Sequence, residues 1–514
     1  MPYTNMKPYN IIISALVSSA LIFSSCSKDF LEVENPGGES IEEYYTTDAH
    51  VQEALVAAYD PLHWPDWGLG SYNSTNICSE IMSDNVWFGG ASAGDMLNWH
   101  KLANFDGDSN NTLGSLWTID YSGIKRCNDV LKYIDWAKED ITPENQQLYA
   151  AQARILRVYY YNMLWHFFGN IPFYIENLEK PYQAEQLPAE ETYLFLVKEL
   201  EEVLEAQVLP MYWEDNSAAD KNIGRVSQAM GYMLYAEMVM YSGDKDRYPK
   251  ALGYMKEIIT DGHYALLDDF AALWQEENEW CEESIFEINY NDDNNLRGWG
   301  SPLAVGGTVL PTLISPNGWQ GGKGLSAGAD GWGFMPVRLE TLEQFTEGDK
   351  RIEGTFWDAR EDEYSVRYQD TGLWLAKYIA QSDNNKDAGF DNNLNYNNNL
   401  RVYRYAETLL NAAELSLETG SVGDAATYLN EVRQRAGLES LSTVTLDDII
   451  QERRLEFVGE GKRYWDLVRT GKAATVLVPE GFRTNGWSEH NRFIPIPLSE
   501  LDSSPNLVQN KGYK

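Results

Sequence analysis

The sequence predicts an all-α fold in which tetratricopeptide-like helix pairs form a scaffold that carries large irregular loops and minor β-structure. Three features support this prediction. Apolar residues recur at spacings of three and four over several segments, which places them on one face of a helix. Some of these segments follow one another after a short glycine-containing turn, as in a helical repeat. The remaining stretches are rich in Gly, Asn and Trp and show few helical stripes.

The first long helix is expected around residues 153–167. Its apolar stripe consists of Ala153, Leu156, Tyr160, Met163 and Phe167. Gly169 and Asn170 end the stripe, and Pro172 follows, which is a typical helix stop. Segments 116–137 and 189–208 have the same character and are expected to be helices as well.

Two helix pairs are expected further along the chain. Segments 225–242 and 247–260 form the first pair, with a turn at Gly243. The second pair has stripes at 406–417 and 425–436, each stopped by a glycine, and matches the length of one tetratricopeptide repeat. Charged residues from Glu452 to Asp466 fall at helical spacing, so helix-surface and interhelical ion pairs explain them.

Two long stretches, 61–115 and 268–400, are expected to be irregular. Loops of this length inside a compact protein are usually functional or disordered. Disorder does not suit segments in which Trp and Tyr are so frequent. Within the second stretch, the alternation at 284–288 predicts a short strand. We therefore expect ordered loops on a helical scaffold.

The amino terminus resembles a bacterial lipoprotein signal. Lys7 precedes a short apolar run at 11–23, and Cys26 follows two serines. The run is too short for a permanent membrane span, so residues 1–25 are expected to be a signal peptide and Cys26 the lipidated first residue. The alternative is an ordinary signal peptide that is cut nearby, with Cys26 unmodified. With the lipid on one residue, the rest of the chain would remain water-soluble.

Composition narrows the function classes. A net charge of −38 argues against nucleic acid as a partner, because such a surface repels phosphates. The same charge argues against adhesion to anionic lipid, which leaves the acyl chains of Cys26 as the expected membrane link. Cys78, Cys127 and Cys281 are widely spaced and odd in number, so we expect free thiols rather than a disulfide framework or a metal site.

Several sequence blocks together resemble the SusD/RagB family of outer-membrane glycan-binding lipoproteins of Bacteroidetes. These blocks are 29–32 (DFLE), 154–161 (RILRVYYY), 168–172 (FGNIP), 224–226 (GRV), 404–407 (RYAE), 429–437 (LNEVRQRAG), 452–467 (ERRLEFVGEGKRYWDL) and 494–510. None of them is decisive alone, but their number and order make the resemblance specific. It extends over nearly the whole chain.

The resemblance implies one SusD-like domain at 26–514, with scaffold helices mainly at about 116–260 and 400–470 and ligand-facing loops at about 61–115 and 268–400. It further implies a lipid-anchored protein of the outer membrane that faces the cell exterior. Such a protein binds an oligosaccharide and acts as a lid that delivers it to a SusC-like TonB-dependent transporter. It would not be an enzyme.

Aromatic residues in the irregular loops are the best candidates for sugar contacts. An indole can stack on the apolar C–H face of a pyranose, while amides and hydroxyls bond its hydroxyl groups. The predicted ligand-binding residues are Trp87, Trp299, Trp319, Asn85, Tyr290 and Asn291. For each Trp the alternative is burial as a loop anchor. Trp332 lies in a Gly-Trp-Gly motif that recurs in the family as scaffold, so it is not among the expected contacts.

The sequence gives little support for an enzymatic activity or a bound cofactor. Ser92 lies in a G-x-S-x-G pattern, but no apolar strand precedes it and no strand–helix alternation surrounds it. No cofactor is predicted. Segment 383–399 is rich in Asp and Asn and could hold calcium, but it lacks EF-hand spacing and is interpreted as a solvated loop. Three further readings stay open: peptide cargo, a surface glycoside hydrolase with two carboxylates in an aromatic groove, and a repeat scaffold for protein contacts alone.

Overall fold

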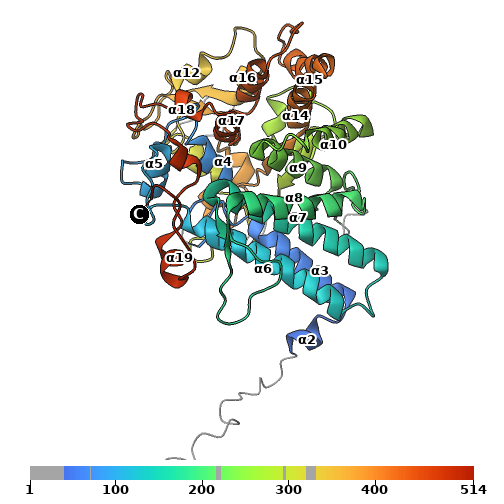
Figure 1. Cartoon of the computed structure of the whole chain (residues 1–514). Coiled ribbons are helices and arrows are strands. Elements are labelled where there is room, and N and C mark those ends of the chain that lie inside the picture. Colours follow the sequence, from blue (N-terminus) through green and yellow to red (C-terminus); the bar gives the residue numbers. More distant parts are fainter. Residues whose placement is uncertain (1–39, 70, 216–220, 293–296, 320–330, 514) are drawn as a thin grey trace, which may run out of the picture.

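A computed structural model describes residues 40–513 except 70, 216–220, 293–296 and 320–330. Its scaffold is a succession of antiparallel helices in which each packs on the next (Figure 1). These helices are α3 (Asp48–Tyr59), α6 (Gly114–Trp136), α7 (Pro143–Phe168), α8 (Ala189–Glu205), α9 (Gln228–Ser242), α10 (Tyr248–Asp261), α14 (Tyr405–Glu418) and α15 (Val422–Arg435). The predicted all-α fold with tetratricopeptide-like pairs is confirmed, although α3 was not expected.

The remaining helices are short and lie mostly in the loops and the carboxyl-terminal part. They are α2 (Ile41–Tyr44), α4 (Thr75–Glu80), α5 (Leu97–Ala103), α11 (Leu310–Ile314), α12 (Leu339–Leu342), α13 (Arg351–Thr355), α16 (Leu446–Glu456), α17 (Arg463–Arg469), α18 (Ala473–Val476) and α19 (Leu498–Ser503). No helix in the described ranges has both the length and the apolar character needed to cross a membrane.

The central helix α7 shows how the sequence sets the scaffold. The Thr142 hydroxyl accepts a hydrogen bond from the amide of Asn145, and Pro143 follows the cap, so the start of the helix is well defined. Gly123 of α6 lies against the ring of Tyr160, where a Cβ atom would come within 2.5 Å of the ring. The small residue lets α6 and α7 approach closely, and most of the second half of α7 is buried as a result.

In the described residues, the strands form three small antiparallel pairs. Strand β3 (Ser284–Ile288) pairs with β6 (Leu400–Arg404), β4 (Phe356–Asp358) with β5 (Leu373–Leu375), and β1 (Ile171–Pro172) with β2 (Gln186–Leu187). The strand predicted at 284–288 is confirmed. Because β6 runs directly into α14, the β3–β6 pair joins the irregular stretch 268–400 to the scaffold.

Buried arginines strengthen this junction. The guanidinium of Arg404 lies 3.1 Å from Glu456 and 2.8 Å from Glu460, and Arg351 lies 2.7 Å from Glu452. Burial opposes the ionisation of Glu456, but Arg435, Arg404 and Arg351 together hold its pKa well below the usual range. The loops are therefore attached to the carboxyl-terminal helices by fully charged, buried ion pairs.

Candidate functional site

The six predicted contact residues do not lie on one surface. Asn85 is completely buried: its amide donates to Glu80 at 2.8 Å, and its side-chain oxygen accepts from Arg454 at 3.0 Å. Trp319 is 3% exposed and packs edge-to-face on Trp357 at 4.4 Å. In the described structure both side chains hold loops together, and neither is available to a ligand at the surface.

Two further predicted residues lie near the start of the loop that follows β3. Tyr290 is buried, and burial raises the pKa of its hydroxyl. Asn291 is exposed, and its backbone amide donates to Gly306 at 3.2 Å. The side chain of Tyr290 therefore faces the interior, while Asn291 is at the surface.

Trp299 is the predicted residue that the structure places as a stacking surface. Its side chain is 51% exposed. Its ring stacks on Trp332 with a centroid distance of 6.0 Å and an interplanar angle of 24°, and it meets Trp67 edge-to-face at 5.1 Å. Tyr72 closes the group, with its ring 5.6 Å from that of Trp332 and 6.2 Å from that of Trp67. We call these four residues the aromatic platform.

Three members of this platform, Trp67, Trp332 and Tyr72, were not among the predicted contacts. Trp332 was expected to be scaffold, but it is only partly buried and extends the surface of Trp299. A signal was present, since both residues lie in a Gly-Trp-Gly motif. Tyr72 carried no pattern that distinguished it from the other loop tyrosines, because its position depends on loops far apart in the sequence.

A buried ion pair holds the two loop regions together beneath the platform. The guanidinium of Arg297 is fully buried and lies 2.8 Å from the carboxylate of Asp66. It also donates to the carbonyls of Trp67 at 2.8 Å, Pro302 at 3.1 Å and Gly307. Asp66 in turn accepts hydrogen bonds from the hydroxyl of Thr308 and from the backbone amide of Val309. The pair thus fixes the backbone beside both Trp67 and Trp299.

The backbone around Trp299 and Trp332 is restrained as well. The amide of Trp299 donates to Asp391 at 3.0 Å, and that of Trp332 donates to Thr312 at 2.6 Å. The Trp332 carbonyl accepts from the guanidinium of Arg367 at 3.0 Å. Gly331 is required here, because a Cβ atom would lie 2.0 Å from the carbonyl oxygen of Ser315. The platform is therefore preorganised rather than assembled by a ligand.

Polar groups adjoin the platform. Burial and the nearby charge of Asp66 raise the pKa of Tyr72, so its hydroxyl remains protonated and can both donate and accept. Asp95, whose carboxylate accepts the amide of Ala91 at 2.8 Å, is close enough to Tyr72 to contribute to the same effect. Aromatic faces with hydroxyl and carboxylate groups at their edge are suited to neutral, polyhydroxylated ligands.

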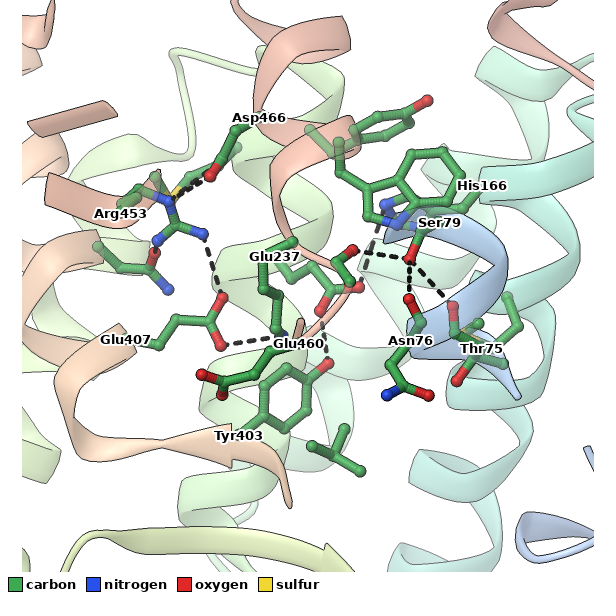
Figure 2. A pocket seen from close by; sticks show the side chains of 18 of the residues that line it. Thr75, Asn76, Ser79, His166, Glu237, Tyr403, Glu407, Arg453, Glu460 and Asp466 are labelled. Atoms are coloured by element: carbon green, nitrogen blue, oxygen red, sulfur yellow. Dashed lines mark hydrogen bonds and ion pairs between the residues drawn. The ribbon is translucent and has the colours of Figure 1, made fainter. Parts of the chain in front are cut away.

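A second candidate is a pocket of about 110 Å³ inside the scaffold, drawn in Figure 2. Its charged side chains bind one another: Arg453 lies 2.8 Å from Asp466, and Lys462 lies 2.9 Å from Glu407. The Tyr403 hydroxyl donates to Glu237 at 2.8 Å. These contacts confirm ion pairing for the 452–466 charges, although the pairs are buried rather than exposed. We assign this pocket to the packing of the scaffold.

The structure tests the serine-hydrolase pattern at Ser92 and the possibility of a metal cluster in the described residues. Ser92 lies in an exposed turn, and His100 contacts its carbonyl oxygen rather than its hydroxyl, at 3.1 Å. Among the described residues, no strand leads into this serine, and the next helix, α5, is short and does not start at it, so the arrangement of a hydrolase nucleophile is missing from this part of the chain. Within the described ranges, no group of three or more His, Cys, Asp and Glu side chains is placed to hold a metal ion.

A helical-repeat scaffold that carries ordered aromatic loops suits a ligand-binding protein, and comparison with known proteins identifies the family. The model of the SusD family matches residues 351–513, and a SusD-like model described as starch-binding associating with outer membrane matches residues 29–222. The chain belongs to the SusD/RagB family, which confirms the resemblance inferred from the sequence blocks.

Solved structures of related proteins agree over most of the chain. Surface glycan-binding protein A from Bacteroides uniformis is 57% identical, with a TM-score of 0.83 over 90% of this chain and 99% of its own. Surface glycan-binding protein A from Bacteroides thetaiotaomicron, in complex with laminarihexaose, is 51% identical, with a TM-score of 0.85 over 90% of this chain and 100% of its own. The starch-binding protein SusD of Bacteroides thetaiotaomicron is 28% identical, over 71% of this chain and 72% of its own length.

Proposed function

We propose that this protein binds a glucan of the laminarin type at the cell surface, on the aromatic platform. The observation that carries the proposal is the stacking of the exposed Trp299 on the partly buried Trp332, on a restrained backbone. The similarity to a surface glycan-binding protein that was solved with laminarihexaose favours laminarin-type glucans over starch, since the starch-binding relative is more distant.

The chemistry of the platform suits reversible capture. Indole faces stack on the C–H faces of glucose units, and the edge groups Tyr72 and Asp95 can exchange hydrogen bonds with hydroxyls. Two or three stacking aromatics on an open surface correspond to micromolar to millimolar dissociation constants, or about −4 to −8 kcal/mol. Weak binding is compatible with a protein that must release its cargo.

The structure gives less support to peptide cargo and to glycoside hydrolysis than to glucan binding. Peptide cargo would favour pockets with unpaired charges, but the nearest buried charges, Asp66 and Arg297, neutralise each other. Glycoside hydrolysis needs two carboxyl groups placed across the scissile bond. Of the acids near the platform, Asp391 binds the amide of Trp299 and Asp95 that of Ala91, so both have structural partners. Binding without cleavage is the activity that we propose.

The setting of this activity is also part of the proposal. Cys26, which lies outside the described residues, would carry the acyl chains that anchor the protein in the outer membrane, facing the cell exterior. The partner would be a SusC-like TonB-dependent transporter, over which the protein acts as a lid. The family and the family-model name support an outer-membrane setting. The net charge of −38 supports a cargo other than nucleic acid.

Calorimetric titration of the chain from Ser27 onward with laminarihexaose, maltohexaose and a mixed peptide library tests the proposal. We expect saturable binding of laminarihexaose and its loss in Trp299→Ala. The exposed Phe195 on α8, which is 54% accessible, offers a matched control as Phe195→Ala. Peptide binding without glucan binding would overturn the proposed cargo, and unchanged affinity in Trp299→Ala would overturn the proposed site.

A further inference from the structure

A second hollow with aromatic walls lies close to the platform. It has a volume of about 280 Å³, and its walls include Trp87, Leu97, Lys101, Asn104, Tyr368 and Phe482. Three of these side chains are large, apolar or aromatic, and exposed: Phe482 at 47%, Leu97 at 45% and Tyr368 at 38%. Exposed apolar side chains that gather around one concavity indicate a binding site more often than chance exposure does. We call it the Trp87 hollow.

The wall formed by Phe482 is built on Trp87. The turn from Glu480 to Arg483 is closed by mutual backbone hydrogen bonds of 3.0 and 2.9 Å. At Gly481, φ is +56°, and a Cβ atom would lie 2.7 Å from the indole of Trp87. Only glycine can rest on the ring in this way, and the turn then presents Phe482 edge-to-face with Trp87 at 5.3 Å.

Trp87 is itself held from the other side. The guanidinium of Arg338 lies 4.1 Å from the centroid of the indole, and it also binds Glu480 at 2.6 Å. With 7% of its surface exposed, Trp87 acts as a rigid wall, while the accessible stacking faces belong to Phe482 and Tyr368. Trp87, which was predicted to contact the ligand together with Trp299, thus lies in the wall of the hollow and not in the platform.

The charges in the hollow favour a neutral occupant. Lys101 is paired with Asp108 at 2.8 Å. Arg483 donates to the carbonyls of Ala103 at 2.8 Å and Ile81 at 3.2 Å, which lie at the carboxyl ends of α5 and α4. Burial lowers the pKa of His100, so its imidazole is neutral at pH 7. The cations are engaged, so the hollow offers no free counter-charge for an anionic ligand.

Polar groups at the rim suit hydroxyls instead. The side-chain oxygen of Asn104 already accepts from the amide and hydroxyl of Thr484 at 2.7 and 2.9 Å, which leaves its NH₂ group as a donor. Asp106 is exposed at the same rim and can accept. The volume is below the roughly 300–1,000 Å³ that drug-sized ligands occupy, which fits one or two sugar rings.

The hollow and the platform share one segment of chain. Arg367 donates to the carbonyl of Trp332 at 3.0 Å, and the next residue, Tyr368, forms a wall of the hollow. The amide of Tyr368 donates to Gly90 at 3.1 Å, and its ring lies 5.5 Å from that of His100. The two places are therefore joined by neighbouring residues of one loop, and we expect a single polymer chain to reach both.

We infer that the Trp87 hollow is a second sugar-binding site, which takes a neutral hexose unit of the same polysaccharide that the platform binds. This inference rests on the proposed function, and it adds a second point of attachment. When one unit is held on the platform, a nearby unit meets the hollow at high effective concentration, so even a weak second contact raises the affinity for long chains. A trisaccharide that occupies one site is expected to gain nothing from the other.

The test compares a glucose trisaccharide with the polysaccharide of the same linkage, by calorimetry on the chain from Ser27 onward. For Phe482→Ala and Tyr368→Ala we expect affinity for the polysaccharide to fall at least about tenfold and affinity for the trisaccharide to be unchanged. Phe195→Ala should match the wild type with both ligands. Thermal unfolding of each variant shows whether the fold is kept, and both exposed substitutions are expected to keep it.

The outcomes separate this inference from the proposed function. Absence of any glucan binding by the wild type would overturn the proposed function. Glucan binding that Trp299→Ala abolishes, with wild-type polysaccharide affinity in both hollow variants, would overturn the second site alone. An equal loss for trisaccharide and polysaccharide would place Phe482 and Tyr368 in the first site and would overturn the inference as well.

Discussion

Replacing Arg297 by methionine should destabilise the protein and disorganise the platform together. The substitution keeps an unbranched apolar stem but leaves the Asp66 carboxylate, which is 4% exposed, without its guanidinium partner. Three backbone carbonyls, those of Trp67, Pro302 and Gly307, lose a donor at the same time. Breaking a buried pair from one side costs about 3–5 kcal/mol, because the remaining charge is stranded in the interior.

That loss is a large part of the 5–15 kcal/mol by which domains are typically stable. Urea unfolding followed by tryptophan fluorescence measures it, and laminarihexaose titration measures the loss of the platform. The matched control is Arg360→Met. Arg360 binds Asp358 at 2.5 Å, but the two side chains are 49% and 40% exposed, so at most about 1 kcal/mol is expected.

The double variant Asp66→Asn, Arg297→Met separates the effect of the stranded charge from that of the lost hydrogen-bond donor. With the stranded charge removed, about 1–3 kcal/mol should return, while the carbonyls remain without their donor. Glucan affinity should stay low, since the backbone at Trp67 is still unsupported. An Arg297→Met protein that unfolds within about 0.5 kcal/mol of the wild type would refute the claim that this pair holds the loops.

Three further predictions follow from burial and charge. Trp332→Ala should weaken glucan binding at least about tenfold, and it should cost less stability than Trp319→Ala because Trp332 is only partly buried. Trp319→Ala, at 3% exposure, should cost about 3–5 kcal/mol of stability and leave affinity intact; calorimetry and urea unfolding distinguish the two. Burial, together with the charges of Glu287 and Glu276, raises the pKa of Glu279 to about 8, so the folded state holds a proton that the unfolded state releases near pH 4.5. The free energy of unfolding should therefore decline as pH rises from about 4.5 to about 8. Unfolding measured across that window should show a flatter decline for Glu279→Gln. Burial alone raises the pKa of Asp120 well above its usual value, and within the described residues its Oδ2 atom has no hydrogen-bond partner. Asp120→Asn should therefore raise the melting temperature at pH 8 and lose this advantage toward pH 4. An equal or lower melting temperature of the variant at pH 8 would contradict this explanation.

Periodicity predicted the scaffold because helices form from local sequence. The stripe from Ala153 to Phe167 lies within α7, and the glycine stops at 243, 420 and 437 follow α9, α14 and α15 closely. The strand at 284–288 was also visible, since its alternation is local. In each case the residues that decide the structure are neighbours along the chain.

The sequence predicted which type of residue forms the site, but not which individual residues do. Composition indicated aromatic loops, but exposure separates Trp299 from Trp319, and it is decided by contacts across long sequence distances. Trp319 packs on Trp357 and is covered, whereas Trp299 stacks on Trp332 at the surface. Nothing within a window around either tryptophan encodes its partner, so sequence reasoning identified candidates without ranking them.

Arginine explains how irregular loops can form a rigid site on an acidic protein. Loops lack the repeated hydrogen bonds of helices, so their conformation must be set by specific tertiary contacts. Here the fully buried guanidinium groups of Arg297, Arg351 and Arg404 each bind carboxylates or carbonyls from separate segments, and planar donors impose both distance and direction. A platform fixed in this way loses little conformational entropy when a glucan binds, so a small stacking area is sufficient for capture, and the weak net affinity still permits release.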